Sequence, residues 1–293
     1  MNPLVSVIIT TYKRADMLGR AIESVLKQTY KPIEIIVVDD NGNVSEYRKQ
    51  TEKVMSRYLS NPNIYYIKHE INRNGAAARN TGIKNSKGQI ITFLDDDDWY
   101  YSRKVEEQVD FLLNNNQYQG VYCGWLREGE ECIPNFEGNI SFELLSGEAL
   151  IYTNSIMIWK KYILDIDGWD EKFVRYQEAA FLLRFFKSGF KMGVVKKVLF
   201  EFDISDRSNA LNSRRNEDIV TFYLAEHKSI IEKFPLKQQK IIYSWRYRGV
   251  MLSYLKNLQF YEAFRIYIKM MSLIPIRFNY DLIRYFFRRV RKN

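Results

Sequence analysis

The sequence has few residues of the kinds that form disulfides or bind zinc. Its 293 residues include two cysteines, Cys123 and Cys132, and two histidines, His69 and His227. Two cysteines cannot form a disulfide framework, so we expect free thiols and a reducing compartment, although one bridge between them stays open. A zinc site would have to gather all four side chains, and nothing in their spacing favours that.

Several catalytic and targeting motifs are also absent. No G-x-G-x-x-G follows the first apolar run and no G-x-x-x-x-G-K-[ST] occurs, which argues against a nicotinamide-dependent dehydrogenase and a P-loop enzyme. No apolar run approaches the roughly 18 residues of a membrane-spanning helix. The N-terminal stretch MNPLVSVIITTYKR lacks the basic region and apolar core of a secretory signal. We therefore expect a cytoplasmic protein, either soluble or attached to a membrane surface.

Negative charge is scarce at the C-terminal end. From Leu236 onward there are 13 lysines and arginines against Glu262 and Asp281, a balance of +11, whereas the rest of the chain carries 31 against 33. The basic residues are interleaved with aromatic and aliphatic ones at helical spacing, which is typical of helices that lie on an anionic membrane surface. Alternatively, the apolar faces pack on one another and leave the cations solvated. A nucleic-acid partner is not expected.

Short apolar runs alternate with helical patterns in the first hundred residues. The runs are LVSVIIT at 4–10, IEIIVV at 33–38, NIYYIK at 63–68 and QIITFL at 89–94. The helical patterns lie at about 15–28, 45–59 and 76–86. This alternation predicts an α/β fold with a mostly parallel sheet covered by helices on both faces. In such sheets ligands bind outside the carboxyl ends of the strands, so the polar residues that follow each run are candidates for a site.

Beyond Cys123 the pattern is less regular. We expect strands at 155–161 and 192–202, a helix at about 177–188, and a polar, turn-rich stretch at 203–218. After that stretch the sequence predicts helices only. The predicted organisation is therefore a first domain at 1–210 and a helical, basic and aromatic C-terminal region at 211–293.

Four consecutive aspartates, Asp95 to Asp98, follow the apolar run QIITFL. Two like charges about 4 Å apart near a protein surface repel by roughly 4 kcal/mol. A divalent cation removes that cost, and Mg²⁺ or Mn²⁺ favours one or two carboxylates together with substrate phosphates. The alternative is a solvated acidic turn at the N-terminus of the next helix, where negative charge is favourable.

Four motifs together resemble glycosyltransferase family 2, inverting enzymes of the GT-A fold. They are VSVIITTYKR, IIVVDDNG, NRNGAAARNTGI and ITFLDDDDWY, and they occur in the family's order over roughly residues 3 to 200. The resemblance implies a GT-A fold with a C-terminal helical extension. It also implies binding of a nucleotide-sugar donor.

The resemblance assigns roles to residues that follow the strands. Thr10, Tyr12 and Asp40 match positions that hold the nucleobase, and Arg79 matches a basic residue that faces the nucleotide. Asp97 matches the direct metal ligand, with Asp95 as its companion and Asp95 or Asp96 near the ribose. The implied nucleotide-binding set is Thr10, Tyr12, Arg14, Asp40, Arg79, Asp95 and Asp96. Two simpler interpretations stay open: Tyr12 packs at a strand end, and Arg79 pairs with the acidic rim.

An inverting glycosyltransferase also needs a carboxylate that takes the proton of the acceptor hydroxyl. The stretch GWDEKFVRYQEAAFLLRFF resembles the segment that carries this base, and alignment on Leu183 and Arg184 places Glu178 in the base position. Aspartate is commoner there, but glutamate can do the same chemistry. Glu178 could instead be a carboxylate that stabilises a helix N-terminus.

The sequence therefore predicts a metal-dependent inverting glycosyltransferase of the hexosyl- or N-acetylhexosaminyltransferase type. Its cofactor would be Mn²⁺ or Mg²⁺ and its donor a nucleotide-diphosphate sugar, with UDP expected. The acceptor would be a glycan or a polyprenyl-diphosphate-linked sugar in bacterial capsule or exopolysaccharide synthesis. We expect a location at the inner face of the cell membrane as a peripheral protein. The rival hypothesis is a non-catalytic nucleotide-sugar-binding or scaffold protein of the same fold.

Overall fold

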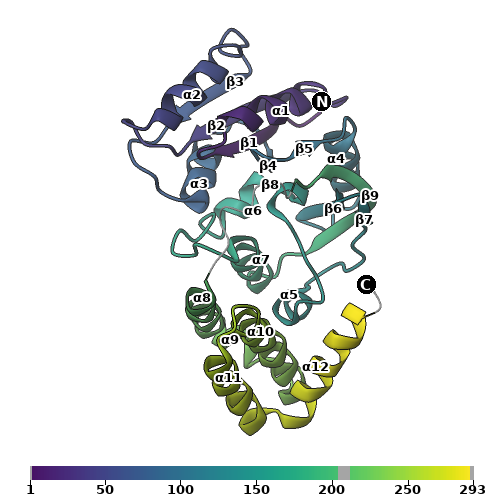
Figure 1. Cartoon of the computed structure of the whole chain (residues 1–293). Coiled ribbons are helices and arrows are strands. Elements are labelled where there is room, and N and C mark those ends of the chain that lie inside the picture. The colour runs from purple at the N-terminus through teal and green to yellow at the C-terminus, as the bar shows by residue number, and fades with distance from the viewer. Residues whose placement is uncertain (1, 204–211, 291–293) are drawn as a thin grey trace. The chain divides into compact units, whose positions relative to one another are not determined.

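The computed structural model describes residues 2–203 and 212–290, without the side chains of 281 and 285–290 (Figure 1). The chain divides into two compact units. The first consists of Met1–Ile140 and Ile151–Asp206, and the second of Ser141–Leu150 and Arg207–Asn293. Each unit has its own core.

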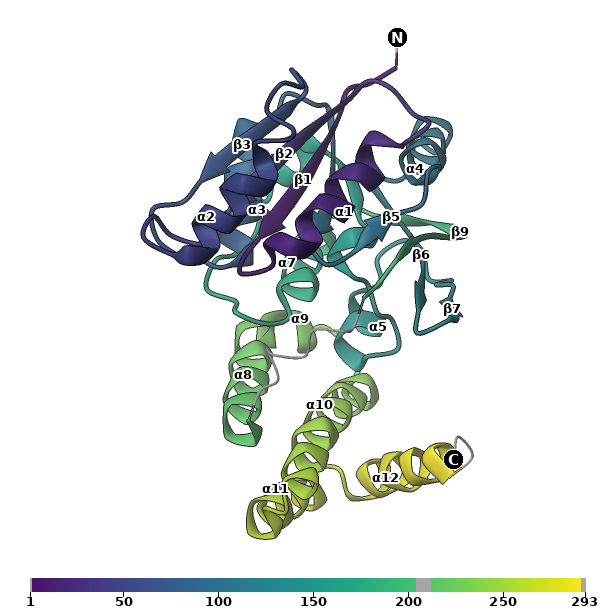
Figure 2. The same cartoon turned by 45° about the horizontal axis from the view of Figure 1, so that its top comes forward.

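The first half of unit 1 is the alternating strand-helix region that the sequence predicts. Its strands are β1 (Val5–Thr11), β2 (Ile33–Asp39), β3 (Ile64–Lys68) and β4 (Ile90–Asp95). Its helices are α1 (Ala15–Leu26), α2 (Glu46–Met55) and α3 (Gly75–Asn85). The strands lie in the order β3-β2-β1-β4 and all three pairings are parallel. β1 and β2 are buried along nearly their whole length because their β-branched side chains pack against helices (Figure 2).

The second half of unit 1 has both parallel and antiparallel strand pairs. It adds β5 (Trp99–Tyr100), β6 (Gly120–Arg127), β7 (Glu130–Cys132), β8 (Met157–Trp159) and β9 (Met192–Glu201). Its helical elements are α4 (Lys104–Asn114), the short 3₁₀ helix η1 (Thr153–Ser155), α6 (Lys160–Leu164) and α7 (Gln177–Lys187). The full order is β3-β2-β1-β4-β8-β6-β9-β5, with β7 on β6. β8 pairs antiparallel with both β4 and β6, whereas β6 and β9 pair parallel, so the sheet is mixed and is entirely parallel only in its N-terminal half.

Unit 2 contains only helices among its described residues. They are α5 (Ser141–Ser146), α8 (Ser213–Glu226), α9 (Lys228–Ile231), α10 (Leu236–Lys256), α11 (Phe260–Leu273) and α12 (Pro275–Val290). α10 is the central element and packs on α5, α8, α11 and α12. None of the helices in the described ranges is both long and apolar enough to cross a lipid bilayer.

Two details of this unit differ from the sequence-based expectation. The predicted turn-rich stretch at 203–218 is helical from Ser213, because the Asn212 side chain accepts a hydrogen bond from the Arg215 N–H at 2.8 Å and caps α8. Residues 204–211 of that stretch lie outside the described residues. The segment 141–150 belongs to unit 2, where the Arg246 guanidinium donates to the carbonyls of Leu144 and Leu145. Cys123 and Cys132, both in unit 1, are free thiols, as expected.

Candidate functional site

The carboxyl ends of β1, β2 and β4 bring three polar loops of unit 1 together. Thr10 lies beside Asp95 in the β1–β4 register, and the Asp40 N–H donates to the Thr11 carbonyl at 3.0 Å. The Lys13 N–H donates to the Asn41 side chain at 2.7 Å, which ties the loop after β1 to the loop after β2. The sequence-based prediction that these loops share one sheet edge is confirmed.

The four aspartates alternate between solvent and interior. The side chains of Asp95 and Asp97 are 28% and 17% exposed, whereas those of Asp96 and Asp98 are buried. The chain turns directly after β4, where the Asp98 N–H donates to the Asp95 carbonyl at 3.2 Å, and this turn directs the side chains alternately outward and inward. Only Asp95 and Asp97 of this run are thus positioned to contact a ligand directly.

The two buried aspartates hold the surrounding loops. Asp96 accepts the Tyr12 N–H at 3.2 Å and lies 2.9 Å from Nε of Arg14. Asp98 accepts hydrogen bonds from the Asn154 side chain and from the N–H of Asp203. Of the two residues expected near the ribose, this arrangement favours Asp95 over Asp96.

Each exposed aspartate pairs with an arginine. Asp97 pairs with Nη1 of Arg14, and Asp95 lies 2.7 Å from Nη2 of Arg79. The ion pair between Arg79 and the acidic rim that the sequence left open is therefore present. The same guanidinium also stands over the buried Trp169 ring at 4.9 Å. The nucleotide-facing role that the resemblance implies for Arg79 stays a prediction.

Crowding and burial work against ionisation of this run. Burial raises the pKa of Asp96 to about 7, against the opposing effect of Arg14. Burial, reinforced by the neighbouring Asp95, raises the pKa of Asp97 to about 6. Burial, followed by the charge of Asp97, raises the pKa of Asp98 to about 9. A cation at the exposed edge would favour the ionised form of Asp97 and so would lower its pKa.

The residues fit a divalent cation that is shared with a substrate. Within residues 2–203 and 212–290, no cluster of three or more histidine, cysteine, aspartate or glutamate side chains is arranged to hold a metal ion. Asp95 and Asp97 offer carboxylate oxygens at a partly exposed edge, which is the donor set that Mg²⁺ or Mn²⁺ completes with phosphate oxygens and water. A cation enclosed by protein ligands alone does not fit these residues.

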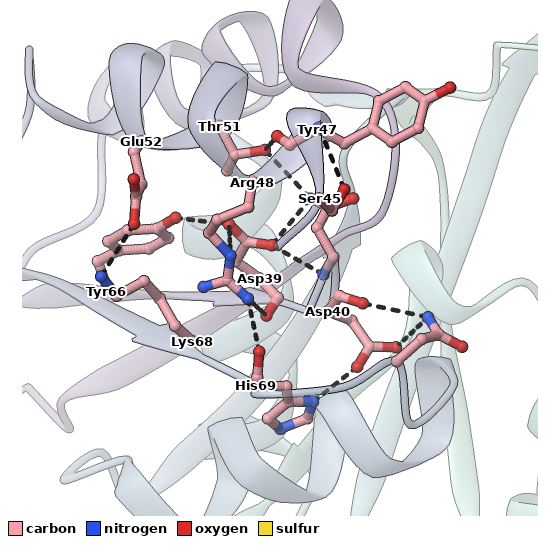
Figure 3. Close-up of polar contacts among 12 residues, drawn as sticks. Asp39, Asp40, Ser45, Tyr47, Arg48, Thr51, Glu52, Tyr66, Lys68 and His69 are labelled. Carbon is pink, nitrogen blue, oxygen red and sulfur yellow. Dashed lines mark hydrogen bonds and ion pairs between the residues drawn. The ribbon is translucent and has the colours of Figure 1, made fainter. Parts of the chain in front are cut away.

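The two aspartates at the end of β2 have different environments (Figure 3). Asp39 is fully buried and accepts hydrogen bonds from the Tyr66 hydroxyl at 2.5 Å and from the Asn41 side chain at 2.8 Å. The Arg48 guanidinium lies 3.3 Å from Asp39 and donates to the carbonyl of His69 at 2.6 Å. Since its neighbours surround it, Asp39 holds the fold of this corner.

Asp40 keeps part of its acceptor capacity. His69 Nδ1 lies 2.7 Å from Asp40 Oδ1, which also accepts the Arg73 N–H at 2.8 Å, and Oδ2 accepts from the Asn72 side chain at 2.8 Å. A carboxylate accepts about four hydrogen bonds. One position is therefore left for a further donor, such as a ring N–H of a nucleobase. The Tyr12 ring nearby is partly exposed, so it is not simply packed at the end of its strand.

Glu178 lies in the first turn of α7 and is linked to the aspartate run. The Thr153 hydroxyl donates to Glu178 Oε1 at 2.8 Å. The next residue, Asn154, donates to Asp98 and accepts the Asp95 N–H at 2.7 Å. Arg79 makes a second link, because it donates to the Gln177 side chain at 2.8 Å as well as to Asp95. The predicted base and the predicted metal ligands therefore belong to one hydrogen-bonded site.

The sequence did not indicate four of the residues at this site. Thr153 and Asn154 lie in η1, and Arg20 and Asp203 form an ion pair of 2.9 Å beside Asp97. The only signal for the first two is the polar triplet TNS directly before the apolar run IMI at 156–158. Arg20 and Asp203 are 183 residues apart, and no local pattern pairs them.

Comparison with known proteins gives one family match and several relatives. The model of glycosyl transferase family 2 matches residues 6–189. An uncharacterized glycosyltransferase of Methanocaldococcus jannaschii is 28% identical over 76% of this chain and 78% of its own. The Escherichia coli protein WfgD, a UDP-Glc:alpha-D-GlcNAc-diphosphoundecaprenol beta-1,3-glucosyltransferase, is 36% identical over 39% of this chain and 42% of its own. This chain also spans 39% of an uncharacterized glycosyltransferase of Rickettsia bellii, at 30% identity.

Solved structures share the fold at low identity. The mannosyltransferase PcManGT of Pyrobaculum calidifontis, in complex with GDP-Man and Mn²⁺, has a TM-score of 0.63 at 16% identity, over 93% of this chain and 76% of that one. TarS 1-349 of S. aureus, in complex with UDP-GlcNAc, has a TM-score of 0.59 at 15% identity, over 85% of this chain and 81% of that one. These similarities confirm the GT-A fold that the sequence motifs predict.

Proposed function

Because the chain belongs to glycosyl transferase family 2, we propose that it is a metal-dependent inverting glycosyltransferase that uses a UDP-sugar donor. The observation that carries the proposal is the link between the two halves of the site. Glu178 accepts a hydrogen bond from Thr153, and the next residue, Asn154, accepts the Asp95 N–H and donates to Asp98, the neighbour of Asp97 in the chain. This link supports a site in which a base for the acceptor and carboxylates for the donor act together.

At the donor end, Asp97 and Asp95 would hold Mn²⁺ or Mg²⁺ against the diphosphate of the donor. When bound, the cation stabilises the negative charge that develops on the departing diphosphate. Arg14 and Arg79 pair with these carboxylates and would supply positive charge to the phosphates of a bound donor. Asp40, with Thr10 and Tyr12 beside it, is proposed to hold the nucleobase through its one remaining acceptor position.

At the acceptor end, Glu178 is proposed as the general base. As the acceptor oxygen bonds to the anomeric carbon and the bond from that carbon to the diphosphate oxygen breaks, the acceptor proton passes to Glu178. The Thr153 hydroxyl holds Oε1, so Oε2 is the oxygen that would take the proton. A single displacement of this kind inverts the anomeric configuration.

The acceptor is proposed to be a lipid-linked sugar in bacterial surface polysaccharide synthesis. The name of the E. coli relative WfgD specifies a diphosphoundecaprenol-linked acceptor, and the basic C-terminal helices would suit an anionic membrane surface. The protein would then act as a peripheral protein at the inner face of the membrane.

Calorimetric titration of UDP and GDP into the protein, with Mn²⁺ and then with EDTA, tests the donor half of this proposal. We expect UDP to bind more tightly with Mn²⁺, and Asp97→Ala to remove that difference. A UDP affinity that is changed neither by Mn²⁺ nor by Asp97→Ala would contradict the metal assignment. Tighter binding of GDP than of UDP would contradict the choice of nucleotide.

A further inference from the structure

Unit 2 contains a groove of about 720 Å³ between α10 and α12. This volume is within the range of about 300–1,000 Å³ that is usual for small-molecule sites. Its apolar surface comes from Leu236 and Ile241 of α10 together with Ile274, Pro275 and Ile276. The groove is therefore aliphatic and extends along the start of both helices.

The charged lining of the groove is entirely positive. Lys237 and Lys240 are three residues apart on α10 and so lie on one face of it. Arg277 and Tyr280 of α12 complete the lining, with the guanidinium 5.5 Å from the centre of the Tyr280 ring. The lining residues, all within the described part of the chain, include no carboxylate. A ligand that fits this lining is anionic at one end.

The aliphatic side chains here are exposed to water to an unusual degree. Ile276 is 87% exposed and Leu236 is 66% exposed. Covering apolar surface yields about 25 cal/mol per Å², so an apolar ligand would gain free energy at this place. Figure 2 shows α12 diverging from the paired α10 and α11.

On α11 a second set of apolar side chains faces water. Phe260, Phe264 and Ile268 follow one another at intervals of four residues and are all exposed, whereas Ala263 and Ile266 face the core of the unit. Their spacing forms a stripe along one face of the helix. Unit 2 therefore exposes apolar side chains on α11 as well as in the groove.

We propose that the groove between α10 and α12 binds one anionic phospholipid, with an acyl chain on the aliphatic floor and the phosphate at Lys237 and Lys240. One side of the groove is aliphatic and the other is cationic, which matches an amphiphile with a negatively charged head group. A nucleic acid does not match, because it has no hydrocarbon chain to cover the aliphatic side. This lipid site would be part of the membrane contact in the proposed function, and it rests on that proposal because the membrane would supply the lipid. It does not require transferase activity.

Calorimetry with a short-chain lipid below its micelle concentration tests the proposal on the full chain. We expect dihexanoylphosphatidylglycerol to bind saturably with one molecule per chain, and dihexanoylphosphatidylcholine and glycerol phosphate to bind at least about fivefold more weakly. A cation near a lipid phosphate contributes about 1 kcal/mol, or about fivefold. The double variant Lys237→Gln/Lys240→Gln should therefore weaken binding by about 25-fold, and Ile276→Asp by at least about tenfold.

Matched controls lie in unit 1. Lys53→Gln removes an exposed lysine from α2, and Leu59→Asp places a charge at another exposed aliphatic side chain. Both should leave lipid affinity unchanged, and UDP affinity should stay at the wild-type value in all variants, which reports that unit 1 is folded. UDP binding also separates the two proposals, because either ligand can fail to bind while the other binds.

Three results would overturn the proposal. One is the absence of saturable binding of the anionic lipid to the wild-type protein. Another is equal affinity for glycerol phosphate, which would identify a simple anion site. The third is a change of oligomeric state in Ile276→Asp, measured by light scattering, with unchanged lipid affinity, since a second copy of the chain would then be the occupant.

Discussion

At the scale of single residues, Thr153 is the side chain that orients the proposed base. It is buried, and its hydroxyl donates to Glu178 Oε1 at 2.8 Å. Replacement by valine keeps the shape and removes the donor, and a hydrogen bond to a charged group contributes about 1.5–3 kcal/mol. We expect Thr153→Val to lower kcat by about tenfold or more, with KM for the donor unchanged.

The matched control is Thr153→Ser, which keeps the hydroxyl and should retain most of the activity. Steady-state kinetics of UDP release with a UDP-sugar donor measures both variants. If serine and valine lowered kcat equally, the effect would come from packing, and the orienting role would be wrong.

Lys104 gives a prediction about pH. It is fully buried, donates to Gln108 at 2.6 Å and stands over the Tyr100 ring at 4.0 Å. Burial lowers the pKa of Lys104 from 10.5 to about 8. Below pH 8 the Lys104 ammonium is protonated in both the folded and the unfolded chain. Between pH 8 and 10.5 only the unfolded chain keeps this proton, so the free energy of unfolding increases as the pH rises.

Over that window the gain amounts to about 3 kcal/mol. Lys104→Met removes this pH dependence. The difference between the free energies of unfolding of the wild type and the variant should therefore increase in favour of the wild type from pH 8 to pH 10, by up to about 3 kcal/mol. Urea unfolding at several pH values measures the difference and cancels the titration of other groups. A constant difference across the window would show that burial does not shift this pKa.

Site residues that follow a predicted strand could be identified from the sequence, whereas residues that act through distant contacts could not. It placed Asp95 and Asp97 at the edge because they follow an apolar strand. Which of the four aspartates are exposed and which are buried depends on the turn after β4. Four identical residues in a row contain no pattern from which this could be predicted. Thr153 and Asn154 act through contacts with residues far along the chain, so no local pattern identified them.

At the scale of elements, the packing of α3 on β1 depends on a glycine. A Cβ at Gly82 would lie 2.4 Å from Cγ2 of Ile8, which is fully buried. We expect Gly82→Ala to lower the free energy of unfolding by about 1–2 kcal/mol, because overpacking outweighs the better helix propensity of alanine.

Gly249 in α10 is the control for that variant. Nothing lies within 4 Å of a Cβ built there, so Gly249→Ala should stabilise its helix by about 0.5–1 kcal/mol. Thermal or urea unfolding of both variants provides the comparison. Stabilisation by both substitutions would mean that α3 can shift away from β1 without cost.

Elements with strong local signals were predicted well, and elements defined by distant partners were not. The strands β1, β2 and β4 are continuous apolar runs, and the helices between them have clear periodicity. β8 lies within the strand predicted at 155–161, but its antiparallel pairing with both β4 and β6 depends on distant residues and was not predicted. The segment 141–150 likewise belongs to unit 2 through contacts with α10 that no short window of sequence contains.

At the scale of the whole molecule, charge is distributed unevenly along the chain. The segment from Leu236 onward carries the entire positive excess. If this segment meets an anionic membrane, salt should weaken the contact, because exposed charges are screened beyond about 10 Å at 0.1 M ionic strength. We expect sedimentation with phosphatidylglycerol-containing vesicles to fall steeply between about 0.05 and 0.5 M NaCl. Binding that is unchanged by salt would show that cations do not contribute.

The proposed function depends on Glu178 acting as the catalytic base of a glycosyltransferase. The most direct measurement is the rate of UDP release from a panel of UDP-sugars, each with a panel of sugar acceptors that includes lipid-linked ones. It is made on the wild-type protein and on Glu178→Gln, with the UDP affinity of each measured in parallel. The account predicts turnover by the wild type, a kcat at least about a hundredfold lower in the variant, and equal UDP affinity. Wild-type turnover in Glu178→Gln, or no turnover by either protein with any donor, would contradict it.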